Sequence, residues 1–304
     1  MIASFLDFLH GDFVYGFRHS PIAVVSAAIL LLLVCAGVFA PWVAPFDPTD
    51  LASLSIMDSF KPPMPLPDSD PANVLGTDSQ GRDMLSAIMF GLRISLTVGF
   101  CAVAIATAIG ILIGLTAGYL GGVLDSVLMR IADVQLTFPA ILTALMINGI
   151  VDAALPNAMR DRLQLPVIVM AIGISLWPAI ARTVRGSTLV ERNKEYVQAA
   201  RVIGRSPLAI MFSHVLPNVT GPVLVLATLH VGTAILTEAT LSFLGVGVPP
   251  TQPSLGTLIR IGNDFLFSGE WWITVFPGIA LVVLVLSINL LGDWLRDALN
   301  PKLR

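Results

Sequence analysis

Long apolar runs separated by short polar stretches dominate the pattern of hydrophobic and polar positions along this chain. A helix needs about 20 mostly apolar residues to cross a bilayer, and six runs approach or exceed that length. They cover Ile22–Ala40, Ile94–Tyr119, Val127–Val151, Leu165–Ile180, Val219–Leu244 and Trp272–Leu291. The pattern therefore predicts an all-α integral membrane protein with about six transmembrane helices.

These runs divide the chain into four regions. Residues 1–20 read as a short amphipathic lead-in, and residues 21–93 hold the first span and a long loop. Residues 94–295 form a core of five spans, interrupted by a polar segment at 192–217, and residues 296–304 form a tail. The interruption matters because it is basic and lies between two apolar spans.

Composition agrees with a membrane protein. Of 304 residues, 55% are hydrophobic and 12% are charged, against about 25% charged in a typical soluble domain. The net charge of −3 indicates no nucleic-acid partner. Cys35 and Cys101 each lie inside an apolar run, so no disulfide is expected. The stretch Ala3–Arg18 mixes acidic residues and a histidine into its apolar positions, so we expect no cleavable signal peptide.

The distribution of charge predicts an orientation. With six spans and both termini in the cytoplasm, eleven of the 17 Lys and Arg residues fall inside and six outside, as the positive-inside rule requires. The loop at 43–92 is rich in Asp and would sit poorly on the inner face. This orientation places the polar segment at 192–217 in the cytoplasm.

Within that segment, Glu195–Asn218 carries a helical pattern. An apolar stripe at positions i, i+3, i+4 and i+7 comprises Tyr196, Ala199, Ala200 and Ile203. Two of its members are Ala, so the stripe is shallow and the surface of another protein could approach it closely. The surrounding charge comes from Arg192, Lys194, Glu195, Arg201 and Arg205.

Turn signals follow that stripe in a fixed order. Gly204 can take the left-handed conformation that ends a helix. Ser206 and Pro207 then offer an N-cap and a first helical position, and Pro217 should stop or kink the second helix. A solvent-exposed polar loop between two spans would explain the charges. It would not explain the succession of small-residue stripe, glycine turn and Leu-Pro, so the segment is predicted to form a helix, a sharp turn and a second helix at a membrane surface.

This arrangement resembles the cytoplasmic coupling segment of ATP-binding-cassette importer permeases. That family's pattern stands here as Gln198-Ala199-Ala200, then Gly204, then Leu216-Pro217 at the expected distance; Gln198 replaces an acid and His214 replaces an Ile. The resemblance implies that a separate ATPase docks on these residues: Glu195, Tyr196, Gln198, Ala199, Ala200, Arg201, Gly204, Arg205, His214, Leu216 and Pro217.

Two further stretches, Leu75–Phe100 and Leu236–Ile259, are similar to signatures of the dipeptide, oligopeptide and nickel subfamily of these permeases. The long loop after the first span favours the second, C-type permease of the pair. The resemblance implies a type I (MetI-like) importer fold in the bacterial inner membrane. It also implies a homologous B-type permease, two cytoplasmic ABC ATPases that hold ATP and Mg, and an external solute-binding protein as partners.

The chain itself lacks the residues for enzymatic chemistry. A phosphate-binding loop needs Gly-Lys-Ser/Thr, but the three lysines follow Phe60, Asn193 and Pro301. No His-Glu-x-x-His pair is present either. We therefore expect a non-catalytic subunit that binds no cofactor or metal.

Several polar residues within or beside the spans are candidates for a pathway or for contacts between helices. Glu238 lies in the fifth span and should face a wet pathway or a hydrogen-bonding neighbour; the sequence leaves both open. His230 is more often a packing residue at such a position. Arg130 and Asp133 are predicted to form an i,i+3 pair.

Glycines at four-residue spacing predict close helix packing. Gly110, Gly114 and Gly118 form a small-xxx-small ladder in the second span, which lets two helices approach backbone to backbone in lipid. Pro139 and Pro178 are predicted to kink their spans.

The sequence thus favours the permease subunit of an ATP-driven importer of peptides, although nickel, glutathione and opines are alternative solutes of this architecture. The loops around Asp78–Asp83 and Gly245–Ser254 are expected to meet the binding protein or the partner permease. A self-sufficient secondary transporter or channel would instead show an inverted repeat and several buried ionisable groups. An intramembrane enzyme would need paired nucleophile and base residues, which are missing.

Overall fold

A computed structural model describes residues 12–299 except 49, 51–55, 155 and 250. Within these residues every named element is a helix, and five helices are long and apolar enough to cross a membrane. A sixth span is added if one sharply bent helix pair counts as one. The predicted all-α membrane fold is confirmed. The first 11 residues of the lead-in, and Lys302 and Arg304 of the tail, lie outside the described residues.

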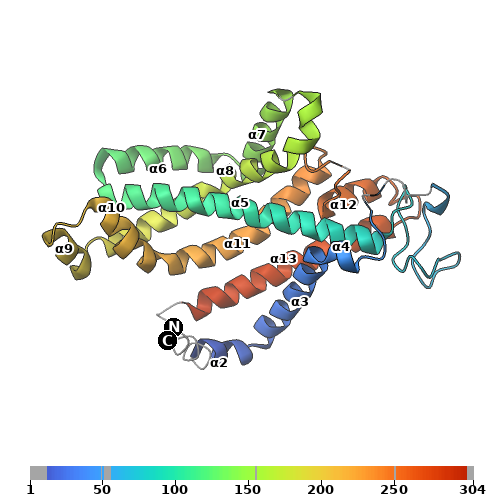
Figure 1. Cartoon of the computed structure of the whole chain (residues 1–304), viewed down its shortest axis with the longest axis horizontal. Coiled ribbons are helices and arrows are strands. Elements are labelled where there is room, and N and C mark those ends of the chain that lie inside the picture. Colours follow the sequence, from blue (N-terminus) through green and yellow to red (C-terminus); the bar gives the residue numbers. More distant parts are fainter. Residues whose placement is uncertain (1–11, 49, 51–55, 155, 250, 300–304) are drawn as a thin grey trace.

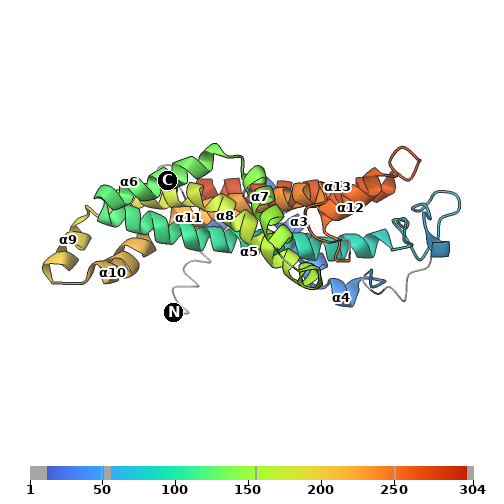
Figure 2. The same ribbon diagram turned by 90° about the horizontal axis from the view of Figure 1, so that it is seen from above.

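The long helices run roughly along one axis of the molecule (Figure 1). In chain order, the elements before the centre are α2 (Asp12–Arg18), α3 (Pro21–Val38), α4 (Ala40–Val43), η1 (Ile56–Asp58) and α5 (Met84–Leu120). The elements after it are α6 (Gly122–Thr137), α7 (Ala140–Ala154), α8 (Asn157–Glu191), α9 (Glu195–Val202), α10 (Pro207–Ile210), η2 (Met211–Val215), α11 (Leu216–Phe243), α12 (Leu255–Asn263) and α13 (Trp272–Ala298). We call the end that carries α9 the tip end and the opposite end, near residues 56–83, the loop end (Figure 2).

Helices α5 and α8 pack along each other and form the centre of the bundle. Glycines at the α5 surface make this possible. A Cβ atom on Gly110 would lie 2.7 Å from Cβ of Ile180, one on Gly114 would lie 2.4 Å from the Ala181 carbonyl oxygen, and one on Gly118 would lie 2.7 Å from Cβ of Thr188. Any side chain at these positions would force the two helices apart, so the ladder faces α8 along its whole length.

Helices α6 and α7 correct the predicted third span. Val127–Val151 is not one helix: α6 and α7 are bent by 93° at Phe138 and Pro139, and α7 turns away from the bundle axis (Figure 1). Phe138 has an extended backbone, with φ −91° and ψ 132°. A residue before proline is disfavoured from the helical region, so Pro139 turns the expected kink into a break. Pro178, in contrast, lies inside the continuous helix α8.

Two spans begin well before their predicted first residues. Helix α5 starts at Met84, ten residues before the predicted start, because the Asp83 side chain accepts a hydrogen bond from the Ser86 amide and caps the helix. Helix α8 extends through the predicted polar stretch before it and the basic residues after it, as far as Glu191. Apolar periodicity alone underestimates such helices because their ends project beyond the hydrocarbon.

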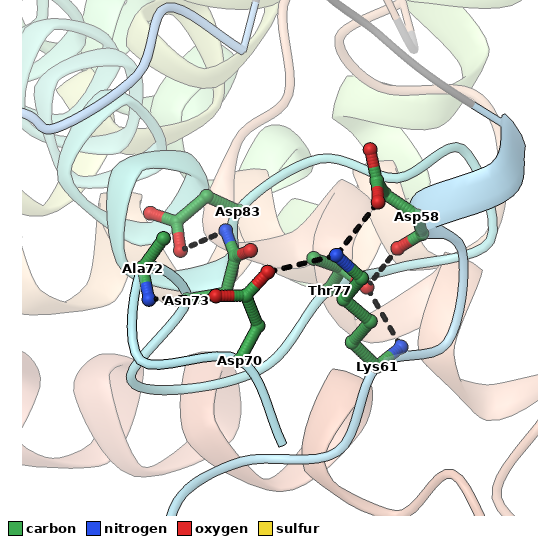
Figure 3. A network of polar contacts seen from close by, with 7 residues as sticks. All are labelled: Asp58, Lys61, Asp70, Ala72, Asn73, Thr77 and Asp83. Atoms are coloured by element: carbon green, nitrogen blue, oxygen red, sulfur yellow. Dashed lines mark hydrogen bonds and ion pairs between the residues drawn. The ribbon is translucent and has the colours of Figure 1, made fainter. Parts of the chain in front are cut away.

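The loop between α4 and α5 folds into a compact cap at the loop end. Lys61 Nζ lies between Asp58 Oδ1, at 2.6 Å, and Asp70 Oδ2, at 2.8 Å (Figure 3). These contacts raise the pKa of Lys61 and lower the pKa of Asp70. Thr77 joins the cap to α13, because its carbonyl oxygen accepts a 3.0 Å hydrogen bond from the Trp272 indole. The acidic residues of this loop therefore serve largely to fold it.

Candidate functional site: the coupling segment and the polar residues of the spans

The predicted helix–turn–helix is present at the tip end. Helix α9 ends in a Schellman motif: the Gly204 amide donates to the Arg201 carbonyl at 3.0 Å, and the Arg205 amide donates to the Ala200 carbonyl at 3.1 Å. Gly204 has φ +85°, a conformation that glycine adopts without a steric penalty. The turn that reverses the chain between α9 and α10 therefore depends on this one residue.

The second helix does not stop at Pro217, which corrects the prediction. Ser206 caps α10, since its hydroxyl accepts from the Ala209 amide, and α10 leads through the π-helical turn η2 directly into α11. Pro217 lies in the first turn of α11, where its missing N–H costs little. The coupling segment is consequently joined to the span α11 by continuous helix.

The inner face of α9 differs from the predicted stripe. Val197 and Ala200 are buried and belong to the same apolar cluster as Ile210, Met211 and Val215 of α10 and η2. The other members of the stripe, Tyr196, Ala199 and Ile203, are exposed. Ala200 thus packs against its own chain, because a face at i and i+3 is enough to hold so short a helix.

The outer surface of the segment includes three large apolar side chains that the described residues leave exposed. Val202 is 88% exposed, Ile203 80% and Leu208 65%, and these side chains lie on either side of the Gly204 turn. Contiguous exposed apolar residues usually mark an interaction surface. We call these three residues the apolar tip; α9 projects beyond the ends of the long helices (Figure 1).

Two arginines tie the segment to the end of α5. Arg192 Nη1 donates to the Gly118 carbonyl at 2.8 Å, and Arg201 Nε donates to the Tyr119 hydroxyl at 3.3 Å. The Arg201 guanidinium also lies over the Tyr119 ring, 5.1 Å from its centroid. Sequence reasoning named Arg201 but missed Tyr119, because nothing in the sequence shows that the end of the second span meets this segment.

The remaining residues of the segment are mostly exposed. Tyr196 donates to the Glu191 carboxylate, and burial together with that hydrogen bond raises the pKa of Tyr196 to about 12. The Gln198 amide donates to the Asn193 carbonyl at 3.0 Å, so the residue that replaces the family's acid closes a local turn. Glu195 and Arg205 are exposed, whereas His214 is half-buried in η2 with Nδ1 unpartnered within the described chain.

Glu238 is fully buried in α11, where it links three elements. Its carboxylate accepts from Ser95 of α5 at 2.8 Å and from Ser242 of α11 at 2.7 Å. Each serine oxygen in turn accepts a backbone N–H: Leu255 donates to Ser95 at 3.4 Å, and Val248 donates to Ser242 at 3.1 Å. The geometry therefore favours the hydrogen-bonding alternative over lining of a wet pathway.

The predicted Arg130–Asp133 pair is wrong. Asp133 instead lies 3.8 Å from Arg182 of α8, and among the described residues no ion pair joins it to Arg130. A two-bond ion pair between α6 and α8 was not predicted. Arg185 of α8 donates hydrogen bonds of 2.5 and 2.7 Å to the two carboxylate oxygens of Asp125 of α6. Ion pairs between α6 and α8 are present instead of the predicted ion pair within one helix. His230 is partly buried, with Nε2 unpartnered in the described part of the chain.

The Asp78–Asp83 stretch is mostly internal. Asp78 accepts from Arg82 Nε at 2.6 Å, and Asn73 donates to Asp83 at 3.1 Å; Asp78, Arg82 and Asp83 are all buried. These charged side chains hold the cap on α5, so they are not available as a contact surface for another protein while the cap is folded.

Comparison with known families places the chain in a class. Residues 110–304 match the model for the binding-protein-dependent transport system inner membrane component, and residues 9–63 match that for the N-terminal TM domain of oligopeptide transport permease C. The chain belongs to the family of inner-membrane permeases of binding-protein-dependent importers, as the coupling segment indicated.

Individual relatives are similar over nearly their whole length. The chain is 39% identical to the di/tripeptide transport system permease protein DppC of Pseudomonas aeruginosa, over 96% of this chain and 92% of that protein. It is 40% identical to the dipeptide transport system permease protein DppC of Escherichia coli, over 96% and 93%.

A solved structure shows the same fold. The inward-facing MetNI methionine ABC transporter matches with a TM-score of 0.51 and 21% sequence identity, over 71% of this chain and 98% of the matched chain. The predicted MetI-like permease fold is confirmed.

Proposed function

We propose that this chain is the C-type permease subunit of an ATP-driven, binding-protein-dependent importer of di- and oligopeptides. It forms one half of a translocation pathway, and a homologous B-type permease forms the other. The observation that carries the proposal is the apolar tip on a helix–turn–helix that is anchored to two long spans. The peptide cargo is supported by the names of relatives that are about 40% identical.

The coupling segment is attached to two long helices, as a lever that moves the spans would be. The segment is continuous with α11 through η2, and Arg192 and Arg201 hold it to the end of α5. A displacement of α9 by an ATPase closing on ATP would therefore move α5 and α11 together. Because α8 packs tightly on α5, the centre of the bundle would rock as a unit between inward-open and outward-open states, as in domain closure.

The proposal fixes the orientation and the partners. The tip end faces the cytoplasm, where two ABC ATPases hold ATP and Mg, and both termini are proposed to lie on the cytoplasmic side. The loop end faces outward, where a solute-binding protein delivers the peptide. The chain itself supplies no catalytic group, so all energy from ATP reaches it through the coupling segment.

Substitution of Gly204 tests the lever. Valine cannot adopt φ +85° without strain, whereas asparagine tolerates that region, and no atom lies within 4 Å of a Cβ at this position. Gly204→Val should abolish peptide uptake while the protein still inserts into the membrane, and Gly204→Asn should retain uptake. Uptake by a well-inserted Gly204→Val variant at the wild-type rate would contradict the assignment.

A second variant separates docking from backbone strain. Ile203→Glu puts a charge on the apolar tip without changing the turn, because Ile203 is 80% exposed. It should weaken recovery of the ATPases in pull-down, whereas Gln198→Glu, which restores the acid of the family pattern nearby, should not.

A further inference from the structure

A pocket of about 420 Å³ lies at the loop end, where α5, the start of α8 and the loop before α12 meet. Its walls are Phe90, Arg93, Ile94, Thr97, Leu165, Thr251, Gln252 and Pro253. Small-molecule sites have volumes of roughly 300–1,000 Å³ and combine apolar walls with a few polar groups. This pocket has that composition: four apolar side chains, one cation and three neutral hydrogen-bonding side chains.

Arg93 gives the pocket an unbalanced positive charge. The residue is exposed on α5, and among the described residues no carboxylate lies within 4.0 Å of it, although other arginines such as Arg82 and Arg185 have acidic partners. Arg93 stands one residue before the apolar run that begins at Ile94, in the part of α5 that precedes the predicted span. The neighbouring wall residues bring no compensating acid.

The loop wall of the pocket is held in place. The Gln164 side chain donates to the Gly247 carbonyl at 2.6 Å, and the Asn148 side chain donates to the Val246 carbonyl. On the far side of the loop, Gly256 packs so closely on α11 that a Cβ would lie 2.4 Å from the Ala239 carbonyl oxygen. The Glu238 network binds Val248 and Leu255 through the two serines. Thr251–Pro253 is thus fixed at both ends, as a preformed site requires.

We propose that this pocket is a peptide contact site in which Arg93 binds the C-terminal carboxylate of the solute. A guanidinium and a carboxylate match as a planar two-bond pair, and each peptide carries one free C-terminal carboxylate. The hydroxyls of Thr97 and Thr251 supply partners for a peptide backbone. The inference rests on the proposed function, since it takes the loop end as the entry side and peptides as the cargo.

Thiol protection tests the site without relying on transport. Cys35 and Cys101 are replaced by Ala, and Gln252→Cys is introduced as a reporter on the pocket wall. The complete complex is placed in phosphatidylcholine nanodiscs without binding protein. Its reaction with a methanethiosulfonate reagent is then followed with and without dialanine. At twice its Kd, dialanine occupies two-thirds of the sites and should slow the reaction about threefold.

Three comparisons decide the outcome. Protection should vanish with Arg93→Gln, return in part with Arg93→Lys, and be absent for dialanine amide, which lacks the carboxylate. A thiol at Arg260, exposed on α12 outside the pocket, should not be protected. Equal protection by the amide, or protection that survives Arg93→Gln, would overturn the carboxylate assignment.

Two further outcomes separate the alternatives. Protection by phosphatidylglycerol in the nanodisc, with no effect of dialanine, would show that the pocket holds an anionic lipid headgroup, and would overturn the proposal. Recovery of the ATPases is measured on the same samples. Failure of protection in a complex that retains its ATPases rejects this site alone, whereas loss of the ATPases in the wild type rejects the proposed function.

Discussion

The carboxylate of Glu238 is fully buried and is compensated by hydrogen bonds. It is fully buried within an apolar span, yet two hydroxyls donate to it, and each hydroxyl receives a backbone N–H from the segment at 245–256. The residue that looked like a candidate for the pathway therefore acts as a hub between α5, α11 and the start of α12. Its position in the sequence could reveal the cost of burial but not the partners.

Substitutions of Glu238 should separate hydrogen bonding from size. Glu238→Leu leaves two buried hydroxyls without their acceptor, and each such loss costs about 1–3 kcal/mol. The melting temperature of the purified protein should fall clearly. Glu238→Gln keeps one acceptor oxygen, so its melting temperature should fall about half as far as that of Glu238→Leu.

Thermal unfolding in detergent provides the measurement, with Asp297→Asn on the exposed end of α13 as the control. A Glu238→Leu protein as stable as wild type would show that the network contributes nothing to the fold.

Sequence reasoning at this scale succeeded where one residue decides its own backbone. Gly204 and Ser206 have roles set by local chemistry: a positive φ at the glycine and a side-chain cap at the serine. The Asp83 cap of α5 is equally local but was not predicted. It failed where the partner lies far along the chain. Asp133 pairs with Arg182, and Arg201 meets Tyr119; neither partner can be found from spacing.

At the scale of elements, the α5–α8 pair is the rigid centre of the molecule. The glycine spacing predicted a close approach and the structure shows which helix makes it, as the distances from Gly114 to Ala181 illustrate. The four-residue period fixes a face of α5, but only the folded bundle identifies the neighbour.

Gly114→Ala should disrupt this packing. The new Cβ would lie 2.4 Å from the Ala181 carbonyl oxygen and 2.7 Å from Cβ of Val184, so the helices must separate. Overpacking of this kind costs about 1–3 kcal/mol. Gly186→Ala is the matched control, since no atom lies within 4 Å of its Cβ position in α8. Comparable melting temperatures for the two variants would count against direct backbone packing.

The cap at the loop end should respond to pH at both extremes. Asp70 has a pKa below its ordinary 3.8, so its contribution is present above that value and is lost as the pH falls further. Lys61 has a pKa above 10.5, so its contribution is present below that value and is lost as the pH rises through the raised pKa. Amide-exchange protection in residues 61–77 should therefore be constant between these limits.

Lys61→Met should lower the amide-exchange protection of residues 61–77 at every pH between these two limits, because it leaves Asp58 and Asp70 without their shared cation. Lys194→Met, which removes the partner of Glu191 at the other end of the molecule, serves as the control. Unchanged exchange of the cap in the Lys61 variant would show that the ion pairs do not order it.

The pattern of apolar residues predicted the existence of the long helices better than it predicted where they begin, end or break. The first, fifth and sixth spans begin within about three residues of their predicted starts, because turn residues or prolines flank them. Helix α8 exceeded its prediction because a helix may continue into water once its centre is fixed by packing. The expected kink at Pro139 is a 93° break, with Phe138 in an extended conformation.

At the scale of the whole molecule, two ends with different chemistry are connected by a stiff bundle. The tip end presents apolar side chains on a helix–turn–helix, and the loop end presents a folded cap and a pocket with one unpaired arginine. The family and the fold could be predicted from the sequence, since the coupling pattern and the apolar runs are local signals. The pocket could not, because its walls come from three separate parts of the chain.

Co-purification tests the central claim most directly. The chain is tagged at its C-terminus, extracted from its native membrane in mild detergent, and its companions are identified by mass spectrometry. The account predicts a second six-span permease and one or two ATPases with phosphate-binding loops, and loss of the ATPases with Ile203→Glu. Recovery of the chain alone, as a stable homo-oligomer that transports peptide without nucleotide, would contradict it.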